Sequence, residues 1–172
     1  MGLLNASQMG SPIQKHEVHI ANDLLWITGE MESLGNPHTY LNQEGLDFLR
    51  ISDAHIVPWS FSRLPTSRSE LLVAARERVQ LLMFTQEASL TEFRTPPNHQ
   101  KLMLHMPLAI IRGEAPFLGE AKIHNFLDFW KGLFFPVIDA EIYYLADCSV
   151  QLPRQSRIVY VNRNILQSYI AT

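Results

Sequence analysis

The sequence contains an internal repeat, and this feature restricts most strongly the folds that the chain can adopt. Residues 24–35 (LLWITGEMESLG) align with residues 108–119 (LAIIRGEAPFLG), and six of the twelve aligned positions are identical. Average residue usage would give about one identity over this length. The sequence therefore predicts two copies of one structural unit.

A second aligned block extends the repeat. After a two-residue shift, residues 40–57 align with residues 126–143 with five identities in eighteen positions. Continued without a gap, this alignment pairs Val73 with Val159. We predict an N-terminal tail (1–14), a first unit (15–86), a linker that contains Pro96-Pro97 (87–99) and a second unit (100–170).

Each unit has the same predicted order of elements: strand, strand, helix, strand, strand, strand. The pair Asn22-Asp23 lies between two apolar runs and is typical of a tight hairpin turn. Apolar residues within 38–50 recur mainly on one side of a helix, which predicts the helix of the first unit. The expected fold class is α+β, mainly β, with each unit a small bent sheet or partly open barrel and the two arranged as a pseudo-two-fold pair.

Composition excludes several classes of protein. Hydrophobic residues make up 47% of the chain and charged residues 18%, which is unlike a disordered chain. The formal net charge of -3 argues against binding of nucleic acid through a basic surface. The single cysteine, Cys148, excludes a disulfide framework and suits a thiol in a reducing cytoplasm. No uncharged apolar run of about 18 residues is present, so membrane contact is not expected.

Several short motifs recur in the two units or close the second one. They are Gly29-Glu30 and Gly113-Glu114, Leu41-Asn42 and Leu127-Asp128, Asp53-Ala54 and Asp139-Ala140, and Val161-Asn162-Arg163 with Ile165. In these motifs the chain resembles tandem copies of a small bacterial β-rich domain family of unknown function. The resemblance implies a β-rich fold and brings no reaction with it.

The repeated acidic residues are the candidates for a polar site. Glu30 and Glu114 follow glycines within strands, and Asp53 and Asp139 begin the next predicted strand of each unit. Carboxylates brought together between the units could perform acid-base catalysis. The competing interpretation is structural: the glycines mark β-bulges, the glutamates are solvated, and the aspartates accept backbone hydrogen bonds.

The two aligned helical windows differ on one face. The first unit has Gln43, Glu44 and Asp47 where the second has Phe129, Trp130 and Leu133. On a helix these three positions would form one face, because they are spaced three and four residues apart. We expect that apolar face to lie at an interaction, either between the units or between two copies of the chain. The alternatives are another protein, an apolar ligand or a membrane surface.

These observations predict a non-enzymatic binding or assembly module. The expected partner is a second copy of the chain or another protein, and no cofactor, metal ion or nucleic acid is expected. The alternative is an enzyme with an acidic site in the cleft between the units, formed by Glu30, Glu114, Asp53 and Asp139. A cluster of perturbed carboxylates in a concave pocket would favour the enzyme, and an apolar contact face would favour the assembly module.

Overall fold

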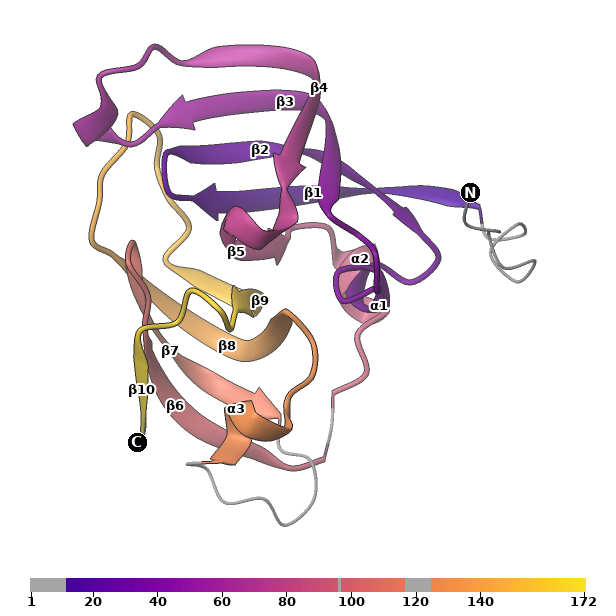
Figure 1. The fold of residues 1–172 in the computed structure, drawn as a ribbon, viewed down its shortest axis with the longest axis vertical. Helices are drawn as coiled ribbons and strands as arrows, with labels where there is room; N and C mark the ends of the chain where they lie inside the picture. Colours follow the sequence, from indigo (N-terminus) through magenta and orange to yellow (C-terminus); the bar gives the residue numbers. More distant parts are fainter. Residues whose placement is uncertain (1–11, 96, 117–124) are drawn as a thin grey trace.

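The computed structural model describes residues 12–95, 97–116 and 125–172, and over these residues the chain forms one sheet of ten antiparallel strands (Figure 1). The strands are β1 (Ile13–Asn22), β2 (Leu25–Leu34), β3 (Phe48–Pro58), β4 (Ser67–Ala75), β5 (Val79–Phe84), β6 (His99–His105), β7 (Ala109–Pro116), β8 (Phe134–Tyr144), β9 (Gln155–Asn162) and β10 (Ser168–Ala171).

The expected α+β class is wrong, because the described chain is almost entirely β. Its α-helices are single short turns of four or five residues: α1 (Pro37–Tyr40), α2 (Glu87–Thr91) and α3 (Phe126–Phe129). Two 3₁₀ turns add Ser60–Ser62 and Arg76–Arg78. The helix expected over 38–50 ends at Tyr40, and residues 48–50 already belong to β3.

Local chemistry explains why this helix stops. Gly45 has a left-handed backbone (φ 76°), which is incompatible with a continuing helix. The carbonyls of Leu41 and Gln43 accept hydrogen bonds from Arg76 Nη1, both at 3.0 Å. From Phe48 onward, side chains alternate between exposed and buried, which is the period of a strand. The apolar residues that suggested a helix therefore belong to a loop and a strand; they are Leu41, Leu46, Phe48 and Leu49.

The order of strands in the sheet is β10-β6-β7-β8-β9-β5-β1-β2-β3-β4. The first five strands (β1 to β5) thus form one half of the sheet, and the last five (β6 to β10) form the other. In each half the fifth strand lies at one side and the fourth strand at the other. The halves are joined where β9, the fourth strand of the second half, pairs with β5, the fifth strand of the first. Figure 1 shows this junction near the middle of the molecule, with β4 at the top and β10 at the lower left.

Two hydrophobic cores lie on opposite faces of this junction. The N-terminal core is built mainly from β1, β2, β3 and β5, and the C-terminal core mainly from β6, β7, β8 and β9. Leu82 of β5 and Tyr160 of β9 face the N-terminal core, whereas their neighbours Leu81 and Val161 face the C-terminal core. Because successive residues of a strand point to opposite faces, the two paired strands form a wall shared by both cores.

Matched β-bulges bend the sheet in both halves. Along the β2–β3 pair, Thr28 lies opposite His55 and Glu30 opposite Ser52, so Gly29 faces both Asp53 and Ala54. Asp53 has a left-handed backbone (φ 49°), which Asp adopts more readily than most residues.

The β7–β8 pair repeats this arrangement. Gly113 lies opposite Asp139 and Ala140, and Asp139 has the same φ of 49°. The glycines are required because a Cβ on Gly29 would lie 2.6 Å from Ile51 Cγ2, and a Cβ on Gly113 would lie 2.6 Å from Val137 Cγ1. The repeated Gly and Asp residues are therefore accounted for by the bulges.

We expect Gly29→Ala to destabilise the protein by about 3 kcal/mol, because the added methyl also meets the carbonyl oxygen of Ser52 and cannot be relieved by a flexible side chain. Gly45→Ala is the matched control. Nothing lies within 4 Å of its added Cβ, so only the left-handed strain, about 1 kcal/mol, should remain. Urea unfolding of the two variants measures the difference. Equal losses of stability would contradict the close approach at the bulge.

Candidate functional site

The candidate carboxylates of the first half lie together. Glu30 and Asp53 line an open hollow of about 390 Å³ beside the β2–β3 bulge. Glu30 Oε2 is 3.4 Å from Lys15 Nζ on β1, and both side chains are more than one third exposed. An ion pair in such a solvated position contributes little to stability.

The second half carries the corresponding pair. Glu114 and Asp139 line a hollow of about 220 Å³, together with His99 and Arg157. Glu114 Oε2 is 3.4 Å from His99 Nδ1, so each glutamate faces a basic residue on the strand before its own.

The two carboxylate pairs do not form one cleft. The hollow at Glu30 and Asp53 shares no lining residue with the hollow at Glu114 and Asp139. Within the described chain, no group of three or more His, Cys, Asp or Glu side chains could hold a metal ion. The structure therefore does not bring the four predicted carboxylates together as one site.

The predicted apolar triad is divided between the two cores. Trp130 packs against the C-terminal core and its ring lies 6.4 Å from that of Phe135, whereas Leu133 packs against the N-terminal core. Phe129 ends α3, and its side chain lies outside the described part of the structure. Since α3 ends at Phe129, the three residues do not share a single helix face as the sequence had suggested.

Polar contacts tie this segment to the first half of the chain. Asn42 Nδ2 donates to Phe134 O, and Phe134 N donates to Asn42 Oδ1, both at 2.8 Å. Trp130 Nε1 also donates to Phe134 O at 3.0 Å, and Arg163 Nη1 donates to Trp130 O. The residues around Trp130 and Leu133 thus lie where the two halves meet.

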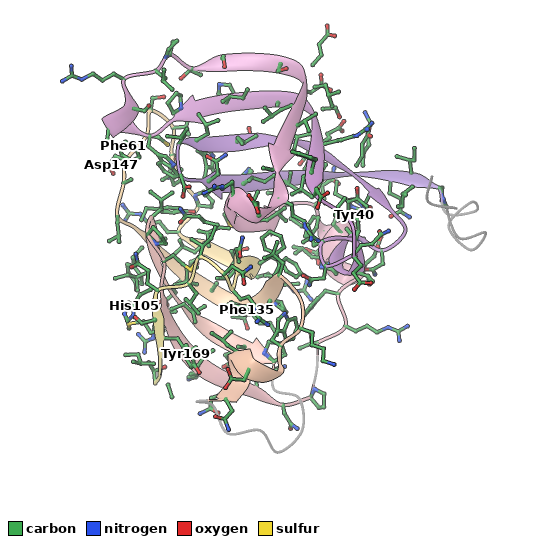
Figure 2. The ribbon with its side chains drawn as sticks, in the orientation of Figure 1. Tyr40, Phe61, His105, Phe135, Asp147 and Tyr169 are labelled. Carbon is green, nitrogen blue, oxygen red and sulfur yellow. The ribbon has the colours of Figure 1, made fainter. Side chains whose placement is uncertain are left out.

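The loops at the other end of the junction also cross between the halves. Ser60 N donates to Asp147 O at 2.7 Å, and Trp59 forms an isolated β-bridge with Cys148. Figure 2 shows Asp147 beside Phe61, the residue after Ser60. These contacts close the junction on the side opposite to Asn42 and Phe134.

A further hollow lies beside this loop of the second half. Its volume is about 980 Å³, and its lining includes Tyr144, Cys148 and Arg154. Burial raises the pKa of the Tyr144 hydroxyl, so this group remains protonated and cannot act as a base near neutral pH. Cys148 Sγ donates to Val150 O at 3.6 Å. The Cys148 thiol in this hollow is thus hydrogen-bonded to a backbone carbonyl.

A buried polar cluster joins α2 to the first half. His16 Nδ1 lies 2.7 Å from Ser89 Oγ, and His16 Nε2 lies 3.1 Å from Ser33 Oγ. Ser33 Oγ donates to Gly35 O, so it accepts from His16 Nε2, and the Ser89 hydroxyl donates to His16 Nδ1. His16 and Ser89 are almost completely buried, so this Ser-His pair cannot meet a substrate.

His38 extends the same cluster across the junction. Its Nε2 donates to Ser89 O at 2.8 Å, and its Nδ1 accepts from the hydroxyl of Tyr160 on β9 at 2.5 Å. Burial raises the pKa of Tyr160, which keeps this donor protonated. A neutral His38 thereby links α1, α2 and β9.

The outer edges of the sheet carry exposed apolar residues that the sequence analysis did not select. Leu71 and Val73 on β4 are each 53% exposed, and Ile170 on β10 is 51% exposed. Neither β4 nor β10 pairs with another described strand along its outer edge. The sequence signal was the run of apolar residues in Ser67–Ala75, but only the strand order shows that this strand lies at an edge.

Comparisons of the chain with protein-family models, with curated proteins and with solved structures found no match. No helix in the described ranges is long and apolar enough to cross a membrane. The functional conclusion therefore depends on the geometry of the chain itself.

The histidine cluster predicts a loss of stability in mild acid. Burial lowers the pKa values of His16 and His38 from 6.5, although Glu92 partly opposes the shift of each. Below about pH 6.5 the unfolded chain therefore binds more protons than the folded one, and stability falls as the pH is lowered. Urea unfolding at about pH 7.5 and about pH 5.5 measures this change.

His38→Gln provides the comparison for this measurement. The Gln amide can still donate to Ser89 O but does not titrate, so the variant should lose less stability between the two pH values than the wild type. Identical losses in the two proteins would show that His38 does not contribute to the acid sensitivity.

Proposed function

We propose that this chain is a non-enzymatic assembly module of the cytoplasm that associates through the open edges of its sheet. The observation that carries the proposal is the outer edge of β4. In the described part of the chain this edge pairs with no further strand, and it carries two side chains, Leu71 and Val73, that are apolar and more than half exposed.

An edge of this kind favours pairing with another strand. The nine residues Ser67–Ala75 include no lysine or proline, and their charged residues are Arg68 and Glu70. Proteins that avoid association usually protect their edge strands with lysine, proline, a bulge or a very short strand. The length and composition of β4 therefore support a role in binding.

The carboxylates support an assembly role over an acidic active site. Glu30 and Glu114 each lie near a basic side chain, and they line separate hollows. A mechanism in which one carboxylate acts as acid and another as base requires both groups within reach of one substrate. The apolar edges are the better basis for a function.

We further propose that the two halves arose by duplication of one unit. Each half has the same strand order, and each has a glycine opposite a left-handed aspartate at the same point of its second and third strands. A duplication would give each half one side formed by its fourth strand and one side formed by its fifth strand. The pairing of such strands within the molecule can then indicate how copies of the chain pair with each other.

The test replaces the exposed apolar residues of β4 with lysine. We expect the wild type to form assemblies larger than one chain, and Leu71→Lys/Val73→Lys to reduce them to single chains, because charge on an edge opposes strand pairing. Both side chains are already more than half exposed, so the variant should fold. Size-exclusion chromatography with light scattering, over a range of concentrations, gives the masses.

Leu24→Lys is the matched control for this experiment. Leu24 is 54% exposed, but it lies in the turn between β1 and β2, away from the outer edges of the sheet. This variant should assemble like the wild type. A wild type that remains a single chain at every concentration, or an assembly unaffected by the lysines on β4, would refute the proposed function.

A further inference from the structure

The junction at the centre of the molecule joins two particular kinds of strand. β9 is the fourth strand of the second half, and β5 is the fifth strand of the first half. The two strands left at the outer edges are the other fourth strand, β4, and the other fifth strand, β10. One copy of the chain therefore displays the two complementary parts of a second junction.

The register of the sheet shows which residues of β4 and β9 correspond. The matching bulges give a common reference point for the two strands, because Ala54 pairs with Ser69 beside the first bulge and Ala140 pairs with Ser156 beside the second. Three residues farther along the fourth strand, Leu72 of β4 occupies the position of Val159 in β9. It follows that Leu71 corresponds to Ile158 and Val73 to Tyr160.

The same comparison relates β10 to β5. Phe84 pairs with Val18 and Ala171 with Leu102, and these partners lie opposite the bulge glycines Gly29 and Gly113 in the neighbouring strands. Counting back from Phe84 and Ala171, Met83 of β5 corresponds to Ile170 of β10. Leu82 and Leu81 then correspond to Tyr169 and Ser168.

Exposure agrees with these correspondences at Leu71, Leu72, Val73, Tyr169 and Ile170. Ile158 and Tyr160 are 2% exposed because β5 and the N-terminal core cover them, whereas the corresponding Leu71 and Val73 are 53% exposed. Met83 is buried beside β9, whereas the corresponding Ile170 is 51% exposed. The residues that face their own half, Leu72 and Tyr169, pack against its core in both cases.

We infer that β4 of one copy of this chain pairs with β10 of a second copy, in the antiparallel register that β9 and β5 use within the molecule. The internal pairs are Val159 with Met83, Tyr160 with Leu82 and Val161 with Leu81. Between copies, the corresponding pairs are Leu72 with Ile170, Val73 with Tyr169 and Ala74 with Ser168. This inference rests on the proposed assembly function and specifies its partner and its geometry.

The contact is head to tail. β4 and β10 lie at opposite ends of the sheet, so each copy uses one edge for each neighbour (Figure 1). An interface between two different surfaces repeats from copy to copy, and it produces a closed ring or an extended filament instead of a symmetric dimer. The internal junction would then recur at every contact along the assembly.

A mixing experiment distinguishes head-to-tail pairing from symmetric pairing. Leu71→Lys/Val73→Lys blocks β4 and leaves β10 intact, whereas Ile170→Lys blocks β10 and leaves β4 intact. Each variant alone should be a single chain. An equimolar mixture should form a complex of two chains, because one open β4 and one open β10 remain. Light scattering after size exclusion measures the three masses.

Cysteine cross-linking tests the register. In a Cys148→Ser background, Leu72→Cys/Ile170→Cys places the two thiols on directly opposed residues of neighbouring copies, where Cβ atoms approach to about 4.5 Å and a disulfide can form. Mild oxidation should give a ladder of linked chains on denaturing gels. Ala74→Cys/Ile170→Cys shifts one thiol by two residues on the same face and should give little linkage.

The outcomes separate this inference from the proposed function. If the chain assembles but Ile170→Lys alone still forms dimers, and single Leu72→Cys links chains in pairs, then β4 pairs with β4. That result would overturn the head-to-tail contact and leave an assembly through the sheet edge. A mixture that stays as single chains, although the wild type assembles, would also overturn the inference. A wild type that never assembles would refute both proposals.

Discussion

The pairing of β5 with β9 is the contact on which the rest of the structure depends. All six residues of Val79–Phe84 are buried, and from Leu81 to Phe84 successive side chains enter different cores. Residues Ile158 to Val161 of β9 alternate in the same way. Because one pair of strands supplies a wall to both cores, neither half can complete its core in the absence of the other. A half of this size would also be only marginally stable alone, because it would bury only about 60% of the surface that its unfolded chain exposes.

The bulges explain how a single sheet can enclose two cores. At Gly29 and at Gly113 the neighbouring strand contributes an extra residue, which increases the local twist and bends the strand. The sheet can then curve around the N-terminal core in one half and around the C-terminal core in the other. The histidine cluster and the Asn42 contacts with Phe134 fasten the two halves on one side of the wall, and the Ser60 contact with Asp147 fastens them on the other.

The sequence predicted local features of this fold better than its overall arrangement. The Asn22-Asp23 hairpin and the bulges at the two glycines are present, because each depends on residues close together in the chain. The helix over 38–50 was wrong, since pairing of β3 with β2 and β4 determines the conformation from Phe48 onward. The ungapped pairing of Val73 with Val159 was also displaced by one residue, because the loop before β9 is longer by one residue than the loop before β4.

The candidate site was less predictable, because it depends on which strands lie at the edges. Leu71, Val73 and Ile170 are ordinary strand residues in the sequence, and only the strand order leaves them uncovered. The acidic residues were candidates because they recur in the two repeats. Asp53 and Asp139 recur because they form the bulges, and Glu30 and Glu114 follow the bulge glycines. The His16 and His38 cluster was not found from the sequence, since its members come from three strands and two short helices that are distant in the chain.

The central claim is that the β5–β9 wall couples the two halves into one cooperative structure. Native-state hydrogen exchange tests it directly, because amides that exchange only through global unfolding share one free energy of opening. We predict that the amides of β5 and β9 are the most protected and share this free energy with the central strands of both halves, β1, β2, β7 and β8. The claim would be contradicted if one half exchanged at a lower free energy while the other stayed protected, or if the β5–β9 amides exchanged before the strands on either side of them.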